Sequence, residues 1–170
     1  MAAALRYGPR AVLSHQSAGA LYEVTRYRGG PIHVSLTSPG PRTKERGIAV
    51  HRRSGLTAED VTTHRGIPVT TIVVTLCDLA TTLEDLALER AVNKADALDL
   101  IDPERLRTRL EGDDRPGAAR LRRLLDRDTF VLTESELEQL FLPLVKRAGL
   151  PSPESQRRSR RTASTSTGRA

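Results

Sequence analysis

The stretch that decides the fold is Gly66-Ile67-Pro68-Val69-Thr70-Thr71, together with the apolar run Ile72–Ala80 that follows it. Gly66 and Pro68 interrupt any helix, and the β-branched residues after them favour a strand. From Leu76 onward, apolar residues recur at helical spacing. The pattern predicts a strand that leads directly into a helix, with short strands before this junction and helices after it.

Upstream of the junction, the sequence predicts a short helix. Ser14 is a suitable N-cap for a helix over residues 15–22, in which Ala18, Leu21 and Tyr22 form the expected buried face. Residues 2–7 resemble the end of another helix, because Gly and Pro follow them directly.

A small antiparallel sheet is expected next. Residues 32–36 and 48–52 alternate apolar and polar side chains, as half-buried strands do. The turn-rich basic segment 38–47 between them predicts a hairpin with a long cationic tip. Residues 60–64 and 67–70 predict two further strands that flank a tight turn at Arg65-Gly66.

Helices are predicted downstream of the junction. Residues 75–82 and 83–97 are the first two, and Asp102-Pro103 combines an N-cap with a first-turn proline and so begins a third. Residues 117–126 predict a fourth helix. A Ser/Thr-x-x-Glu spacing, typical of a capping box, begins a fifth over residues 133–149.

Composition bounds the function. The 170 residues carry a net charge of +6, with a basic front (10 Lys and Arg against 4 Asp and Glu in residues 1–71) and a basic end. Arg outnumbers Lys, as GC-rich coding favours, so the charge alone is weak support for nucleic-acid binding. Cys77 is the single cysteine and is expected to be a buried, inert thiol. Neither a membrane span nor a signal peptide is predicted, which indicates a cytoplasmic protein.

Several short motifs occur in the order known from one family. These segments are Arg10–Ala18, Pro31–Val34, Gly47–Arg52, Asp60–Thr62, Gly66–Thr71 and Leu76–Ala80. With them the chain closely resembles the middle of AbiEi-like antitoxins of actinobacterial type, from type IV toxin-antitoxin systems, over about residues 2–150.

The family arrangement implied by this resemblance adds a domain at each end. A winged-helix DNA-binding domain would precede the module, and a domain similar to very-short-patch-repair and PD-(D/E)XK restriction endonucleases would follow it. Residues 131–150 match the first helix of that nuclease-like domain, and the strands bearing its metal ligands do not follow. A frameshift or truncation near Pro153 is our interpretation, and the Arg/Ser/Thr-rich residues 151–170 are expected to be disordered.

The sequence therefore predicts an α+β fold in four parts. These are a short helix plus small antiparallel sheet (1–74), a helical subdomain (75–130), the first helix of an incomplete nuclease-like domain (131–150) and a disordered basic tail (151–170).

Catalytic and metal sites are not predicted. Glu136, or Glu138, would correspond to the metal-binding glutamate on the first helix of such nucleases, but one carboxylate cannot assemble that site, and helix capping is the alternative reading. His15, His33, His51 and His64 lie in separate elements without the spacing of a zinc site, so structural or surface roles are expected. Asp78 has no evident catalytic partner in the sequence, and no cofactor is expected.

Basic residues of the first 71 positions are the candidates for DNA binding. They are Arg42, Lys44, Arg46, Arg52 and Arg53. A solvated basic loop is the alternative. With three tyrosines, two phenylalanines and no tryptophan, the chain has few rings to stack on bases, so any DNA binding is expected to be weak and nonspecific.

The resemblance implies a non-enzymatic, antitoxin-like or DNA-associated protein, with a cognate toxin or its operator as partner. The alternatives are an inactive or split fragment of a PD-(D/E)XK endonuclease-like protein that needs the remainder in trans, and a decayed gene product without activity.

Overall fold

The structure of the chain is a computed structural model that describes residues 11–36, 46–53, 55–126, 143–145 and 147–148. It divides into two compact units, residues 1–130 and 131–170. In the first unit the order of elements is β1 (Ala11–Leu13), α2 (His15–Leu21), β2 (Ile32–Leu36), β3 (Ile48–Arg52), the 3-10 turn η2 (Ala58–Asp60), β4 (Val61–His64), β5 (Ile67–Thr70), α3 (Ile72–Ala80), α4 (Asp85–Ala97), α5 (Pro103–Arg109) and α6 (Ala118–Leu125). No helix among the described residues is long and apolar enough to cross a membrane.

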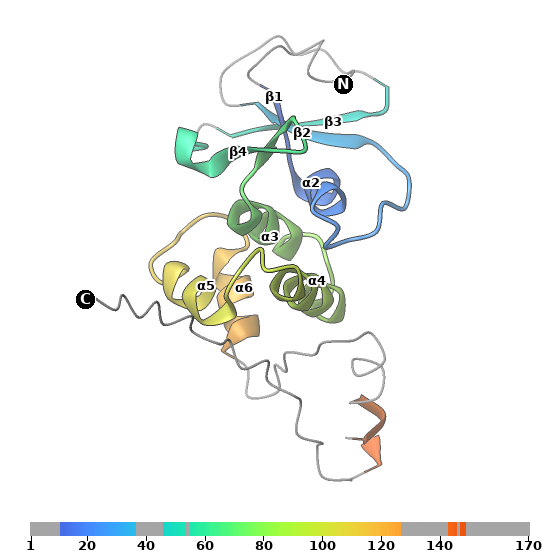
Figure 1. Cartoon of the computed structure of the whole chain (residues 1–170), viewed down its shortest axis with the longest axis vertical. Coiled ribbons are helices and arrows are strands. Elements are labelled where there is room, and N and C mark those ends of the chain that lie inside the picture. The colour runs from blue at the N-terminus through green and yellow to red at the C-terminus, as the bar shows by residue number, and fades with distance from the viewer. Residues whose placement is uncertain (1–10, 37–45, 54, 127–142, 146, 149–170) are drawn as a thin grey trace, which may run out of the picture. The chain divides into compact units, whose positions relative to one another are not determined.

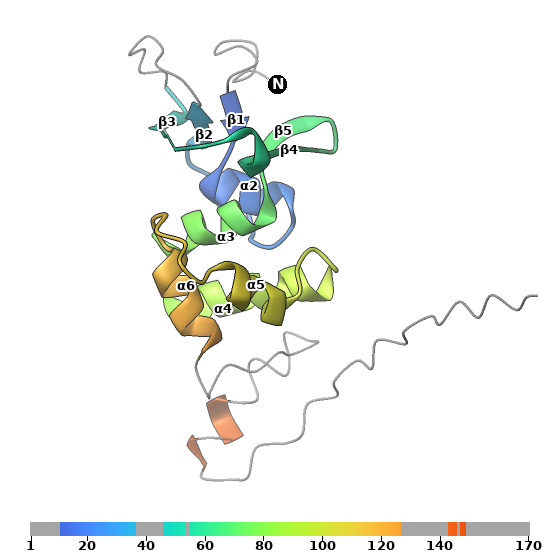
Figure 2. The ribbon, with the colours of Figure 1, turned by 90° about the vertical axis from the view of Figure 1, so that its left-hand side faces the viewer.

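The first unit is layered. Figure 1 shows the strands at one end, α2 and α3 beneath them, and α4, α5 and α6 beyond α3; the turned view in Figure 2 shows the same order. Helix α3 packs against α2 on one side and against α4 and α6 on the other. This arrangement confirms an α+β fold in which a sheet with one interspersed helix, α2, precedes the helices α3 to α6.

The sheet is mixed, so the prediction of an antiparallel sheet is wrong in part. Its strand order is β3-β2-β1-β5-β4. Pairs β1–β2 and β4–β5 are antiparallel, whereas β2–β3 and β1–β5 are parallel. Strands β2 and β3 therefore do not form the predicted hairpin. A parallel pair needs a connection that returns along the sheet, and residues 37–47 are long enough to span a five-residue strand.

The predicted hairpin at Arg65-Gly66 is confirmed. Strands β4 and β5 pair antiparallel, with His64 opposite Ile67. Both turn residues have positive φ, 51° for Arg65 and 75° for Gly66, which is the type I′ geometry that matches the twist of a two-residue hairpin.

The strand-to-helix junction is also confirmed, although α3 begins at Ile72 rather than at the predicted residue 75. Two hydroxyl groups hold the end of β5: Tyr22 Oη donates to the Thr70 carbonyl oxygen at 2.9 Å, and Thr70 Oγ1 lies 2.8 Å from Thr75 Oγ1. All residues from Val74 to Ala80 are buried, because α3 has neighbours on both sides.

The other helices largely follow the sequence. Asp102 caps α5, its carboxylate accepting from the backbone N–H groups of Glu104 and Arg105 at 3.1 Å, and Pro103 lies in the first turn. Leu86, one of the apolar residues of α4, is 51% exposed. The predicted helix over 133–149 and the tail fall mostly outside the described residues.

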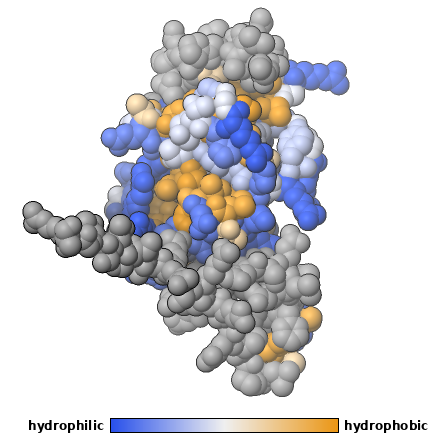
Figure 3. Space-filling view, viewed as in Figure 1, coloured by the Kyte–Doolittle hydropathy of each residue, from blue (hydrophilic) through white to orange (hydrophobic). Residues whose placement is uncertain are grey.

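One large apolar core lies around α3. Gly117, the N-cap residue of α6, lets α6 approach α3 closely, because a Cβ at this position would lie 2.0 Å from the carbonyl oxygen of Cys77. Figure 3 shows apolar side chains gathered at the level of α3 on one face, bordered by polar ones. The fully buried larger members are Leu76, Leu79, Leu88, Leu110, Leu121, Leu124, Val69 and Val92.

An ion pair of Arg115 joins the sheet half to the helical half, and others lie within the helical half. Arg115, in the loop before α6, contacts Asp60 of η2 at 3.0 Å and Asp113 at 2.9 Å. Arg120 of α6 donates to the Ala80 carbonyl oxygen at 2.7 Å and contacts Asp85 at 2.9 Å. The division into parts 1–74 and 75–130 stays a prediction, and the Arg115–Asp60 ion pair crosses it.

Candidate functional site

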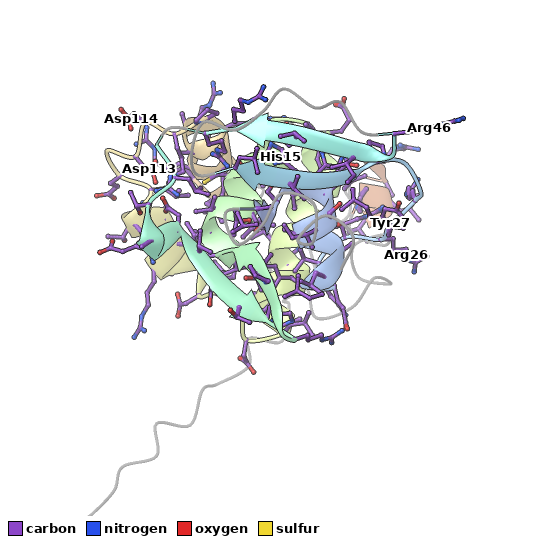
Figure 4. The ribbon with its side chains drawn as sticks, turned by 90° about the horizontal axis from the view of Figure 1, so that it is seen from above. His15, Arg26, Tyr27, Arg46, Asp113 and Asp114 are labelled. Carbon is purple, nitrogen blue, oxygen red and sulfur yellow. The ribbon has the colours of Figure 1, made fainter. Side chains whose placement is uncertain are left out.

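A polar cluster lies between the sheet and α3. Its first residues come from the junction of β1 with α2. The Ser14 N–H donates to the His33 carbonyl oxygen at 3.0 Å, and the His33 N–H donates to Ser17 Oγ at 2.9 Å. His15 has a φ of 51°, a left-handed conformation that is uncommon for residues other than glycine. In the view from above, His15 lies near the middle of the molecule, close to β2 and β3 (Figure 4).

Three histidines stack in this cluster. The ring of His15 lies on that of His51 with centroids 3.7 Å apart and an interplanar angle of 16°. His33 Nδ1 is 3.0 Å from His51 Nε2, a hydrogen bond in which one nitrogen must donate and the other accept. The parallel register of β2 and β3, which sets Ser35 opposite His51, brings these rings together.

Burial keeps these imidazoles neutral. It lowers the pKa of His15 to about 4, helped by the charge of Arg53, and it lowers the pKa of His51 to about 4, helped by the neighbouring histidines. The pKa of His33 is also lowered by burial. At neutral pH the stack therefore carries no positive charge and cannot attract a phosphate group by charge.

Asp78 of α3 is the acidic member of the cluster. Its side chain is 3% exposed, and its Oδ1 atom pairs with Nη1 of Arg53. His15 Nδ1 lies 3.4 Å from Asp78 Oδ2 and 3.0 Å from Ser14 Oγ. Burial raises the pKa of Asp78, and the nearby Arg53 guanidinium opposes this rise. The cluster thus contains one largely buried ion pair beside a neutral stack.

Metal binding finds no support in this geometry. Within the part of the chain that the structure describes, no three His, Cys, Asp or Glu side chains are arranged to hold an ion. Cys77, next to Asp78 in the sequence, is buried as predicted, and burial raises the pKa of its thiol to about 12. It is therefore not a thiolate nucleophile at neutral pH.

The sequence patterns predicted no contact among the histidines, so the cluster was not expected. His15, His33 and His51 come from three elements separated by about 18 residues each, so no spacing rule connects them. A weak signal was present, because His33 and His51 occupy polar positions of alternating strands and would share a face if the strands paired.

The predicted DNA-binding residues lie in different surroundings. Arg46 is exposed just before β3, Arg52 is exposed at its end, and Arg53 turns toward Asp78. Because a strand rises about 3.3 Å per residue, Arg46 and Arg52 are roughly 20 Å apart. Arg42, Lys44 and Glu136 lie outside the described residues. The DNA-binding assignment of these five cations stays a prediction.

Together these features define an α+β domain whose mixed sheet and helical core share one central helix. A family model described as AbiEi antitoxin C-terminal domain matches residues 11–127, more than half of the chain. The chain therefore belongs to the AbiEi antitoxin family. No curated protein and no solved structure matches it.

The match refines the predicted resemblance. It begins at the first residue of β1 and ends two residues after α6, so the sheet and the four helices that follow it form the family domain. Its description names a C-terminal domain rather than a central module. The nuclease-like part and the actinobacterial type gain no support from it. Membership of an antitoxin family implies a toxin as the general kind of partner.

Proposed function

We propose that the chain is a non-enzymatic antitoxin-like protein that associates with DNA through basic side chains of its sheet half. The observation that carries the proposal is the family match, which spans nearly all described residues of the first unit. Residues 1–71 also hold 10 Lys and Arg against 4 Asp and Glu, an excess that favours contact with phosphates.

The described arginines differ in whether a carboxylate lies close to their guanidinium group. In the helical half, Arg107, Arg115 and Arg120 each contact a carboxylate within 4 Å. Among the residues that the structure describes, Arg46 makes no such ion pair. A cation without a carboxylate partner can exchange its counterions for DNA phosphates at less cost.

The chemistry of the polar cluster fits a non-enzymatic role. Its rings stack on one another, His33 bonds to His51, and Asp78 is engaged by Arg53. The neighbouring Cys77 stays protonated at neutral pH. These groups contact one another, whereas a general base must face a substrate proton.

The test is a titration of labelled duplex DNA. Replacing Arg42, Lys44 and Arg46 with alanine should weaken binding to all sequences and reduce the log–log salt slope by about 0.9 per lost phosphate contact. The control replaces three exposed helical arginines, Arg105, Arg109 and Arg123, which changes net charge equally. The wild type should bind at about micromolar Kd or weaker at physiological salt. Strong preference for one duplex over its scrambled form, or equal loss in the control, would contradict the proposal.

Two further arms of the same experiment complete it. Ending the chain at Pro151 should leave binding in place if the sheet half carries it, and should abolish binding if Arg157–Arg161 do. Incubation of DNA with Mg²⁺ should give no cleavage. Cleavage that disappears in Glu136→Ala would revive the nuclease alternative and refute the non-enzymatic role.

A further inference from the structure

An exposed tyrosine lies in the loop that joins α2 to β2. The loop contains the sequence Arg26-Tyr27-Arg28-Gly29-Gly30. Tyr27 is 55% exposed, whereas Tyr22 is 6% exposed. Tyr27 Oη donates to the Gly30 carbonyl oxygen at 2.7 Å. This bond holds the ring in one orientation from its polar end and leaves the aromatic face in contact with water.

The two glycines near the end of the loop lie in open space. Gly29 and Gly30 have φ values of 81° and 101°, and nothing lies within 4 Å of the position a Cβ would take at either residue. At the end of the loop, the Ile32 N–H donates to the Gly47 carbonyl oxygen at 2.8 Å. That bond ties the loop to the start of β3, next to Arg46.

Arginines flank Tyr27 in the sequence, and a third lies on the same edge of the molecule. Arg26, Arg28 and Arg46 are exposed, and Figure 4 shows Arg26, Tyr27 and Arg46 along one edge of the molecule, with Asp113 and Asp114 on the opposite edge. The nearest carboxylate in the loop sequence, Glu23, is paired with Arg65. A ligand at this edge would therefore meet an aromatic face and guanidinium groups together.

We propose that Tyr27, with Arg28 and Arg46, forms a binding site for single-stranded nucleic acid. An unpaired base stacks on the Tyr27 ring, and the two arginines contact the flanking phosphates. Aromatic stacking accepts every base, because each has a π face, and basic grooves with aromatic side chains are the usual means of binding single strands. Bases inside a duplex are already stacked on one another, so this site selects unpaired nucleotides.

The proposed site does not depend on duplex binding, because its distinguishing element is the Tyr27 ring, which stacks on unpaired bases. An acidic protein segment would use the arginines and would gain little from an open phenol face. The purely local alternative is that Tyr27 closes its own loop through the bond to Gly30. Tyr27→Phe and Tyr27→Ala separate these roles: the first removes the bond and keeps the ring, and the second removes both.

The experiment titrates the full chain with fluorescently labelled oligodeoxythymidine of about 12 nucleotides, a length within the usual range for one site. Tyr27→Ala should weaken binding roughly 5- to 100-fold, the range expected for one stacked base, without changing the salt slope. Tyr27→Phe should bind like the wild type. An abasic strand with the same number of phosphates should bind both variants and the wild type equally, and oligouridine tests whether a 2′-hydroxyl adds to the affinity.

Charge is tested with a matched pair of variants. Replacing Arg28 and Arg46 with alanine should lower the log–log salt slope by about 0.7 per contact. Replacing Arg90 and Arg123, exposed on α4 and α6, removes the same charge and should change the slope little. A strand bearing 5-iododeoxyuridine should crosslink under ultraviolet light at Tyr27, identified by peptide mass.

Three results would overturn the proposal: unchanged affinity of Tyr27→Ala, an equal loss for the abasic strand, or a crosslink at another residue. Failure of duplex binding with retained stacking on Tyr27 would count against the proposed DNA association alone. The two proposals are therefore separable.

Discussion

The two sides of helix α3 are stabilised by different physics. Toward α6, Cys77 and Ala80 come close to Gly117 and lie in an apolar core with almost no exposed surface. Toward β3, Asp78 of the same helix meets Arg53 and a stack of neutral histidines. The apolar side depends on shape and volume and should respond little to pH. The polar side depends on charge and should respond to pH through groups that burial has shifted.

The largest effect is expected on the apolar side, from Gly117→Ala. The new Cβ would lie 2.0 Å from the Cys77 carbonyl oxygen, and φ at this position is 84°, where a side chain is strained. Because a backbone atom cannot move aside cheaply, we expect a loss of about 4 kcal/mol or more in the free energy of unfolding. Urea denaturation followed by circular dichroism measures it.

Gly112→Ala is the matched control for this substitution. Its φ of 74° is similarly unfavourable, but nothing lies within 4 Å of the added Cβ. It should lose about 1 kcal/mol, the conformational part alone. Equal losses at the two positions would mean that the approach of α6 to α3 is not tight.

The second largest effect should come from the polar side, through Arg53→Ala. This change leaves the buried Asp78 carboxylate without its cation, and breaking such a pair costs about 3 kcal/mol. The loss should shrink as pH falls, because Asp78, whose pKa is already raised by burial, becomes neutral by taking up a proton. Arg46→Ala removes an exposed guanidinium and should change stability by no more than about 0.5 kcal/mol. A pH-independent loss in Arg53→Ala would contradict this account.

The same contrast explains which parts of the molecule the sequence could predict. The β5–α3 junction was predictable because its signals are local: Gly66 and Pro68 exclude a helix, and the apolar spacing after them favours one. Gly66 also identified the hairpin turn correctly. Likewise Asp102-Pro103 located the start of α5, since a cap depends on its neighbours in sequence.

Pairings between distant segments were not predictable in this way. Strand β1 has three residues, too few to show alternation, yet it lies between β2 and β5 and forms an antiparallel pair with β2 and a parallel pair with β5. The histidine stack depends on the parallel register of β2 and β3, and so it was missed with that register. Leu86 follows the apolar spacing of its helix, but the position it occupies on α4 has no neighbour to cover it.

A third prediction concerns the pH dependence of the polar side. In the native state the pKa values of His15 and His51 are about 4, below the ordinary 6.5, so between these values the unfolded chain binds protons that the native state does not. Stability should therefore be full above pH 6.5 and decrease as pH falls toward 4, by about 1–2 kcal/mol after allowance for partial exposure. Thermal unfolding across this range measures the decrease.

A double variant isolates the part that the histidines contribute. Asn tolerates the positive φ of His15, so His15→Asn with His51→Asn should keep the backbone and flatten the decrease. Asp78 remains in the variant and acts in the opposite direction, because its raised pKa lets the native state take up a proton first. Stability that falls equally in the wild type and the double variant would place the proton uptake elsewhere.

The smallest effect is expected far from α3, at the β4–β5 turn, where neither a core nor a buried charge is involved. Arg65 has a φ of 51° beside Gly66, and Asn-Gly is the preferred pair for a type I′ turn, because Asn adopts positive φ more readily than Arg. Arg65→Asn should therefore stabilise the chain by about 0.5 kcal/mol.

The substitution also removes the ion pair with Glu23, but both side chains are more than half exposed, and such pairs contribute little. Glu23→Gln removes the same pair without touching the turn, so its small loss can be subtracted. A net destabilisation by Arg65→Asn larger than the loss in Glu23→Gln would show that the arginine, rather than the turn geometry, stabilises this hairpin.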